Sequence, residues 1–254
     1  PARSGDPPRI WLGAQLRLLD ADGNPGQQAT VAPFNTETGT FGFDTSISSP
    51  IADGQPYELV FAEDAPLVGM RYLLGLAPAD PLPPVTVRLG TTRGTNALLT
   101  RRGARTALVT TRGFGDVLRI GYQNRPRLFT LNIEKPETLY ETVVEIDERV
   151  TSEGQPLHAP DRRAVHQQLA DLRSSGVESL AICLLNAYNF AEHEQLVAEV
   201  AHEIGFEEIS LSSQVAPLVN VVSRGDTTVV DAYLNPLLRQ YVATINERMT
   251  GGHL

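Results

Sequence analysis

Residues 161–211 read DRRAVHQQLADLRSSGVESLAICLLNAYNFAEHEQLVAEVAHEIGFEEISL. Asp161 is a good N-cap residue, and Val165 and Leu169 recur at helical spacing behind it. Gly176 is a natural stop signal. The pattern predicts, in order, a helix to residue 174, a buried strand at 180–185, a helix at 190–204 and a strand at 207–211. This alternation is typical of parallel strands joined by right-handed crossovers.

The same texture extends upstream to about residue 63. The predicted elements are a helix at 63–76 with Leu67, Met70, Leu73 and Leu74 on one face, strands at 85–89, 105–110 and 143–150, and helices from about 95 and at 113–120. We therefore expect the α/β class, with a mixed, largely parallel sheet flanked by helices. A ribonuclease-H-like layout and a plain doubly wound layout fit equally well.

Residues 8–61 have a different texture. Alternation at 39–44 and a short apolar run at 56–61 predict strands, and the cluster at 20–25 predicts a turn. We expect a small antiparallel β unit here. The predicted organisation is a β-rich insertion at 1–62, an α/β domain at 63–222 and a helical connection at 223–254 that leads into a further domain, so we expect a fragment of a longer protein.

Composition excludes several classes of protein. The net charge is −9, with 30 acidic against 21 basic side chains, which argues against a nucleic-acid partner. There is no apolar run of about 18 residues, so no membrane span is expected, and no signal-peptide pattern. The single cysteine, Cys183, lies in a predicted buried strand and is expected to be a core thiol. The expectation is a cytoplasmic protein.

Most catalytic signatures are missing from the sequence. It has no P-loop, no dinucleotide fingerprint, no His-Glu-x-x-His, no Gly-x-Ser-x-Gly and no paired cysteine motif. The five histidines show no ligand spacing and are predicted to be surface residues: positions 158, 166, 193, 202 and 253. Asp147 and Glu148 are adjacent in a predicted strand and point to opposite faces, so we expect them to pair with arginines rather than with each other.

The stretch from Gly90 to Asn96, Gly-Thr-Thr-Arg-Gly-Thr-Asn, lies between a predicted strand and a predicted helix. Backbone N–H groups at a helix start attract anions, so its polar side chains could bind phosphate or substrate oxygen: Thr91, Thr92, Thr95 and Asn96. The alternative is a capped turn in which Thr95 satisfies the helix N-terminus.

Two further stretches carry polar side chains. In Arg224-Gly-Asp-Thr-Thr228 the guanidinium of Arg224 could grip a carboxylate or phosphate, or the segment could be a helix cap with Asp226 near the positive end of the dipole. Gly121-Tyr-Gln-Asn-Arg-Pro126 is either a substrate loop or a solvated turn, and it contains Gln123 and Arg125.

Taken together, these stretches resemble the hydantoinase/oxoprolinase family, on its oxoprolinase side and in the N-terminal region of the hydantoinase A half. The matching segments run in family order across residues 63–242: Arg88-Leu-Gly-Thr-Thr-Arg-Gly-Thr-Asn-Ala-Leu-Leu99, Ala107-Leu-Val-Thr-Thr-Arg-Gly-Phe114, Leu118-Arg-Ile-Gly-Tyr-Gln-Asn-Arg-Pro126, Val144-Glu-Ile-Asp-Glu-Arg-Val150, Leu211-Ser-Ser-Gln-Val-Ala-Pro217, Ser223-Arg-Gly-Asp-Thr-Thr228 and Asp231-Ala-Tyr-Leu-Asn-Pro236.

The resemblance implies a fold akin to the actin and sugar kinase group, in which ATP lies between two domains, and ATP-dependent opening of a cyclic amide with Mg²⁺. The expected reaction converts 5-oxo-L-proline, ATP and water to L-glutamate, ADP and phosphate. It implies ATP or substrate contacts for Gly90, Thr91, Thr92, Thr95, Asn96, Gln123 and Arg125, and catalytic roles for Arg224, Asp226 and Thr227. The expected partners are the rest of hydantoinase A and a hydantoinase B half.

The sequence departs from the family pattern in one respect. Members usually start with an acidic residue followed by Gly-Gly-Thr-Phe-Thr-Asp, a phosphate-binding hairpin that this sequence lacks, and residues 8–61 match the family poorly. Two alternatives stay open. One is a sister reaction, namely N-methylhydantoin hydrolysis or the ATP-using subunit of an acetone or acetophenone carboxylase. The other is a non-catalytic nucleotide-binding or assembly module.

Overall fold

The computed structural model describes residues 3–44, 47, 50–78, 80–122, 129 and 135–249. The chain forms two compact units. The first contains Pro1–Gly90 with Tyr241–Leu254, and the second contains Thr91–Gln240. These bounds differ from the predicted divisions after residues 62 and 222, because α1 and the loop that follows it pack with the end of the last helix.

The first unit is built on a four-stranded antiparallel sheet of order β3-β2-β1-β4, as the sequence predicts for this region. Its strands are β1 (Gln15–Leu19), β2 (Pro25–Asn35), β3 (Thr40–Phe43) and β4 (Tyr57–Val60). Ile10, Trp11 and Leu16 lie in its core. The predicted turn joins β1 to β2, where the Asp20 carboxylate accepts hydrogen bonds from the backbone N–H groups of Asp22 and Asn24.

Helix α1 (Ala65–Leu74) confirms the predicted helix, although not its whole apolar face. Leu67 is fully buried against Ile245 and its neighbours, whereas Leu73 is 84% exposed. The predicted strand at 85–89 is wrong, since Thr86 forms only an isolated bridge there. Val85 and Val87 pack against the cluster around Leu67 instead. Their alternation therefore reflects one-sided packing against helices.

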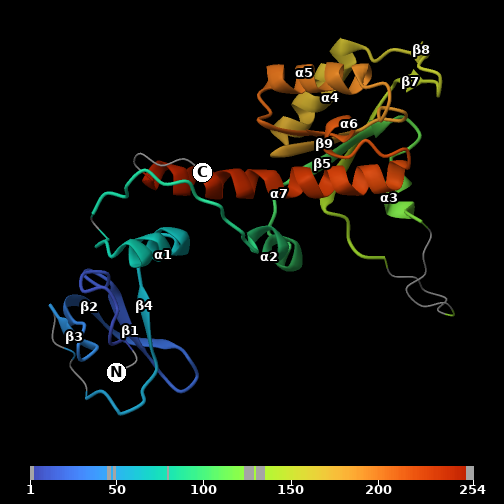
Figure 1. Ribbon diagram of the computed structural model, residues 1–254. Coiled ribbons are helices and arrows are strands. Elements are labelled where there is room, and N and C mark those ends of the chain that lie inside the picture. Colours follow the sequence, from blue (N-terminus) through green and yellow to red (C-terminus); the bar gives the residue numbers. More distant parts are fainter. Residues whose placement is uncertain are drawn as a thin grey trace. The chain divides into compact units, whose positions relative to one another are not determined.

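The second unit contains a four-stranded, entirely parallel sheet of order β10-β9-β5-β6 (Figure 1). Its strands are β5 (Thr106–Thr111), β6 (Tyr140–Ile146), β9 (Ser179–Cys183) and β10 (Glu208–Leu211). Every residue of β5 and β9 is buried, as expected for parallel strands covered on both faces. The predicted α/β class with a largely parallel sheet is confirmed.

Helices cover both faces of this sheet (Figure 1). On one face lie α4 (Arg162–Ser174), whose predicted N-cap Asp161 accepts from the N–H groups of Arg163 and Ala164, and α5 (Glu192–Ile204). The other face packs against the first half of α7 (Val221–Arg248), which places Val229 and Ala232 against Leu108 and Ala181. The long helix therefore has the tertiary partner that the sequence did not reveal.

The predicted strand at 143–150 is interrupted. β6 ends at Ile146, and β7 (Arg149–Val150) pairs antiparallel with β8 (Pro156–His158). Glu148, between the two, turns into the protein and is 2% exposed. The remaining helices are α2 (Arg93–Thr100), α3 (Val117–Ile120) and α6 (Ser212–Val215). Cys183 is buried, as predicted.

Candidate functional site

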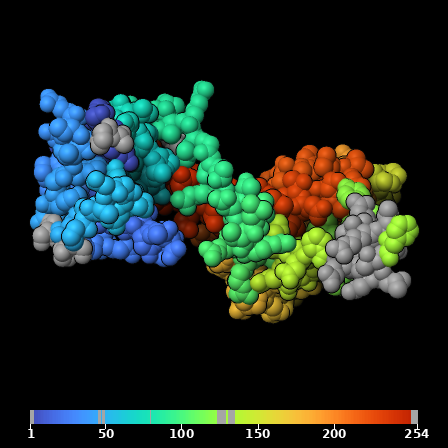
Figure 2. Space-filling view, turned by 90° about the horizontal axis from the view of Figure 1, so that it is seen from below, coloured from blue at the N-terminus to red at the C-terminus, as the bar shows by residue number. Residues whose placement is uncertain are grey.

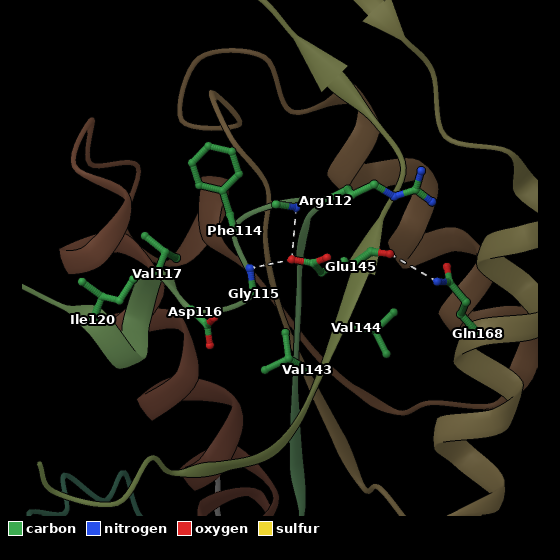
Figure 3. Close-up of a pocket in the computed structure, with 11 residues that line it drawn as sticks. Arg112, Phe114, Gly115, Asp116, Val117, Ile120, Val143, Val144, Glu145 and Gln168 are labelled. Carbon is green, nitrogen blue, oxygen red and sulfur yellow. Dashed lines mark hydrogen bonds between the residues drawn. The ribbon is translucent and has the colours of Figure 1, made fainter.

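A groove runs along the edge strand β6, beneath the turn that follows β5. Figure 3 shows how this turn is fixed: Glu145 Oε1 accepts hydrogen bonds from the backbone N–H groups of Gly113, at 3.1 Å, and Gly115, at 2.7 Å. A Cβ atom on Gly115 would lie 2.8 Å from the same carboxylate oxygen, so a side chain at this position would displace the carboxylate. Gln168 of α4 donates to the Glu145 carbonyl at 3.2 Å. The turn is therefore tied to β6 before α3 begins.

The groove consists of two adjoining cavities of about 960 and 940 Å³. Both are lined by Gly115, Asp116, Ile120 and Val143, so they meet at the start of α3. The first continues under Arg112 and Phe114 (Figure 3). The second continues between α3 and residues 135–138 and carries most of the ionisable side chains. Volumes of this size are typical of small-molecule sites.

The charged end of the groove holds groups of both signs. Arg119 and Lys135 supply positive charge, and Asp116 and Glu137 supply negative charge. Lys135 Nζ donates to the carbonyls of Arg119 and Ile120, each at 2.9 Å, which is the favourable position for a cation at a helix C-terminus. Tyr140 lines the same cavity from β6.

Asp226 of α7 is electrostatically coupled to this end of the groove. Burial is the main cause that raises the pKa of Tyr140, the negative charges of Asp226 and Asp116 raise it further, and the charge of Arg119 opposes them. Asp226 is exposed at the residue level, yet partial desolvation of its carboxyl group raises its pKa. A carboxyl group with a raised pKa that acts on a residue of a cavity wall is a candidate for proton transfer.

Two of the polar stretches singled out in the sequence meet here. The Tyr122 hydroxyl forms a hydrogen bond with the Ser223 hydroxyl and donates another to Asn220 Oδ1 at 3.2 Å. A Cβ atom on Gly225 would lie 2.6 Å from Leu118, so α7 and α3 are in close contact at this level. Gln123 and Arg125 lie outside the described residues. Figure 2 shows the first half of α7, in orange, at the surface of its unit.

Arg224 is fully buried and its guanidinium is engaged within the protein. It donates to the carbonyls of Leu184 (2.9 Å), Leu218 (2.5 Å) and Val219 (3.2 Å), and to Ser212 Oγ (3.0 Å). Ser212 Oγ in turn donates to Glu194 Oε1 at 2.6 Å. This geometry makes Arg224 a positioning residue that holds the start of α7 against the carboxyl ends of β9 and β10.

The hydroxyls of Thr227 and Thr91 are also occupied by backbone groups. Thr227, which is exposed, donates to the carbonyl of Ser223 at 2.8 Å. Thr91 Oγ1 accepts from the N–H of Arg93 at 3.2 Å, so Thr91, rather than Thr95, satisfies the start of α2. Thr92 is the N-cap residue without a capping hydrogen bond from its side chain.

Thr95 and Asn96 are exposed, while Gly94 on the opposite side of α2 faces Leu234 and Leu238 of α7. Leu234 is eight residues beyond Asp226, or about 12 Å along the helix. The predicted site residues therefore lie in two groups. One is at the start of α7 around Asp226, and the other is on α2, which contacts α7 near Leu234. Gly90 is the last residue of the first unit in that part of the chain.

A buried pair of ionisable residues escaped the sequence analysis. Glu148 accepts a hydrogen bond from Thr111 Oγ1 and forms another with His193 Nδ1 at 2.7 Å. The prediction that Glu148 pairs with an arginine is therefore wrong. Asp147 does pair with an arginine, Arg112, at 2.7 Å. No local pattern could have found the pair, since 45 residues separate its members.

His193 is largely buried, with 12% of its side chain exposed, which contradicts the surface position predicted for it. His158, His166 and His202 are exposed as predicted, and His253 lies outside the described residues. Within the described ranges, no three or more His, Cys, Asp or Glu side chains gather in a way that could hold a metal ion. Nor does any described helix have the length and apolar character needed to cross a membrane.

Comparison with known proteins adds to this picture. Residues 55–205 match the model of the hydantoinase/oxoprolinase N-terminal region. The chain is 38% identical over 248 residues to 5-oxoprolinase of Saccharomyces cerevisiae, covering 84% of this chain and 19% of that protein. It is 43% identical over 182 residues to 5-oxoprolinase of Dictyostelium discoideum, covering 62% of this chain and 14% of that protein.

Among solved structures, the ATP-dependent caprolactamase from Pseudomonas jessenii aligns with a TM-score of 0.57 and 27% identity, over 65% of this chain and 25% of that one. The present chain thus spans less than a fifth of the length of the two 5-oxoprolinases.

Proposed function

The chain belongs to the hydantoinase/oxoprolinase family, and from that premise we propose that it is part of an ATP-dependent enzyme that opens a cyclic amide, with 5-oxo-L-proline as the substrate. The products would be L-glutamate, ADP and phosphate. Identity of 38% and 43% to two 5-oxoprolinases supports this substrate over that of the caprolactamase, at 27%.

The observation that carries the proposal is the electrostatic coupling of Asp226 to Tyr140 in the cavity wall. The segment around Asp226 resembles the family motif, and the carboxyl group of this residue acts electrostatically on Tyr140, which lines a cavity of about 940 Å³. Burial raises the pKa of Asp226, which makes its carboxylate the stronger base. We assign Asp226 to accept a proton from the water that attacks the ring carbonyl.

The phenol of Tyr140 complements this base. Since burial and neighbouring carboxylates raise its pKa, the hydroxyl stays protonated at neutral pH and can donate a hydrogen bond to the substrate. Thr227 lies one residue beyond Asp226 and is assigned a substrate contact through its exposed hydroxyl. Arg224 acts through the segment that it holds in place.

The described residues do not form a complete nucleotide site. Thr91 is occupied by the backbone of Arg93, and within the described part no carboxylate cluster is ready for Mg²⁺, although a nucleotide-bound Mg²⁺ needs only one or two protein carboxylates. ATP use is proposed from the family, and no reaction step is assigned through ATP or Mg²⁺. Thr92, Thr95 and Asn96, exposed on α2, are proposed to contribute to the nucleotide or substrate contacts.

We further propose that the remaining parts of a longer protein complete this site, because the relatives extend far beyond the matched region. These parts would be the rest of hydantoinase A and a hydantoinase B half. A buried, unpaired thiol at Cys183 agrees with a reducing cytoplasm as the place of action.

The test measures ATP-dependent phosphate release by the complete protein with 5-oxo-L-proline, N-methylhydantoin or acetone as substrate. Glutamate formation from 5-oxo-L-proline is expected, and Asp226→Asn should lower kcat by roughly 100-fold or more, the usual contribution of a positioned base. Asp171→Asn, an equivalent change on the exposed face of α4, is the matched control. Turnover of another substrate alone, or full activity of Asp226→Asn, would refute the respective assignment.

A further inference from the structure

We propose that Arg119 binds the carboxylate of the substrate and thereby selects cyclic amides that carry a carboxylate over neutral ones. This inference rests on the proposed function, and it adds the chemical basis of substrate choice. Arg119 lies in the groove on α3, a helix to which no catalytic role has been assigned.

The guanidinium of Arg119 is available to a ligand. Arg119 is exposed and lines the charged cavity. Within the described part of the chain its side chain has no ion pair or hydrogen bond, in contrast to Arg105, whose guanidinium is 2.7 Å from the Glu141 carboxylate in the same cavity wall. A planar guanidinium with free donors is the group best suited to bidentate binding of a carboxylate.

The positive charge of Arg119 acts on the wall of the cavity. Arg119 acts electrostatically on the phenol of Tyr140, which is half-buried on the β6 wall. An arginine directed only toward bulk water would be screened from such a group. The positive charge of Arg119 is therefore sensed at the place where the substrate is proposed to bind.

Helix α3, which carries Arg119, is held in place at both ends. The helix has only four residues, but the ammonium group of Lys135 is fixed on the carbonyls of Arg119 and Ile120. At its other end the Glu145 carboxylate holds the preceding turn. Both contacts restrict the backbone that carries Arg119, which reduces the entropy lost when a ligand binds.

The distribution of charge then indicates the ligand. Arg119 and Lys135 supply positive charge to this cavity, and Asp116 and Glu137 supply negative charge. Asp226 adds a negative charge that acts on Tyr140 in the cavity wall. A ligand that carries a carboxylate next to an amide N–H offers a partner to both signs at once. 5-Oxoproline has these two groups, whereas caprolactam and hydantoins lack the carboxylate.

The test is steady-state kinetics of the complete protein with 5-oxo-L-proline, with 2-pyrrolidinone, the same ring without the carboxylate, as a competing ligand. Arg119→Gln should raise KM for 5-oxo-L-proline by roughly 10- to 100-fold, as expected on loss of a charge-assisted hydrogen bond. The inhibition constant of 2-pyrrolidinone should change by less than about twofold. Arg119→Lys should recover part of the loss, because lysine keeps the positive charge but cannot make the bidentate contact of a guanidinium.

Arg163→Gln, which makes the same change on the exposed surface of α4, is the matched control and should leave both constants unchanged. A wild-type KM in Arg119→Gln, with normal turnover of 5-oxo-L-proline, would overturn the role of Arg119 and leave the proposed function standing. Equal weakening of both ligands would also overturn it, since that points to a reshaped groove. Absence of ATP-dependent 5-oxoproline hydrolysis in the wild-type protein would overturn both.

Discussion

Replacement of Arg224 by leucine should destabilise the second unit severely. The substitution removes four hydrogen bonds, leaves the carbonyls of Leu184, Leu218 and Val219 without this donor, and removes the positive charge linked through Ser212 to the buried Glu194. Removing one member of a buried ionic cluster costs about 3–5 kcal/mol. For a unit of this size, spanning Thr91–Gln240, that corresponds to a fall in Tm of roughly 6–20 °C.

The assay is chemical denaturation followed by far-UV circular dichroism, combined with a double-mutant cycle. Glu194→Gln alone should also be destabilising, because Glu194 accepts from Ser212 Oγ and from the N–H groups of Leu184 and Ser213. The double variant should be more stable than the sum of the two single losses predicts. A loss below about 1 kcal/mol for Arg224→Leu, together with a large loss of substrate affinity, would refute the positioning role and restore Arg224 as a ligand-binding residue.

Three other perturbations follow from the structure. Asp161→Ala should lower stability at neutral pH and have no effect in acid, because hydrogen bonds from the N–H groups of Ala164 and Arg163 lower the pKa of Asp161 in the folded state. The stability that this carboxylate contributes is therefore present above its unfolded pKa, ~3.9, and disappears as pH falls through its folded pKa. Denaturation midpoints of wild type and variant that stay equally far apart at low pH would contradict this. Cys183 should react with a thiol reagent no faster than the unit unfolds, because burial raises its pKa, and a rapid burst of modification in the native protein would argue otherwise. Gly115→Ala should displace the Glu145 carboxylate, and it should raise KM for the substrate while changing Tm only slightly. An unchanged KM would show that this turn does not shape the substrate groove.

The helices and parallel strands could be predicted from the sequence because their signals are local. The N-cap at Asp161, the stripe of Val165 and Leu169 and the fully buried β9 each depend on neighbours within a few turns or on burial itself. The false strand at 85–89 shows the limit of this reasoning. Alternating valines pack equally well on one side of an extended segment that has no strand beside it.

The site was less predictable for a different reason. The approach of the segment around Tyr122 to Ser223 could be suspected only from the family resemblance, since about a hundred residues separate them. Arg224 illustrates a second difficulty. Its sequence context resembles a ligand-gripping motif, yet the structure uses every part of its guanidinium internally. Composition cannot distinguish a charge that binds a ligand from one that binds carbonyl groups.

Helix α7 supplies core residues to both compact units of the chain. Val229 and Ala232 complete the apolar layer beneath the parallel sheet, whereas Tyr241 and Ile245 complete the cluster around Leu67. A chain cut at residue 240 would keep every strand of both sheets and still expose Leu67. Fraying of the last three turns of α7 would therefore loosen the cluster around Leu67 while leaving the sheet of the second unit intact.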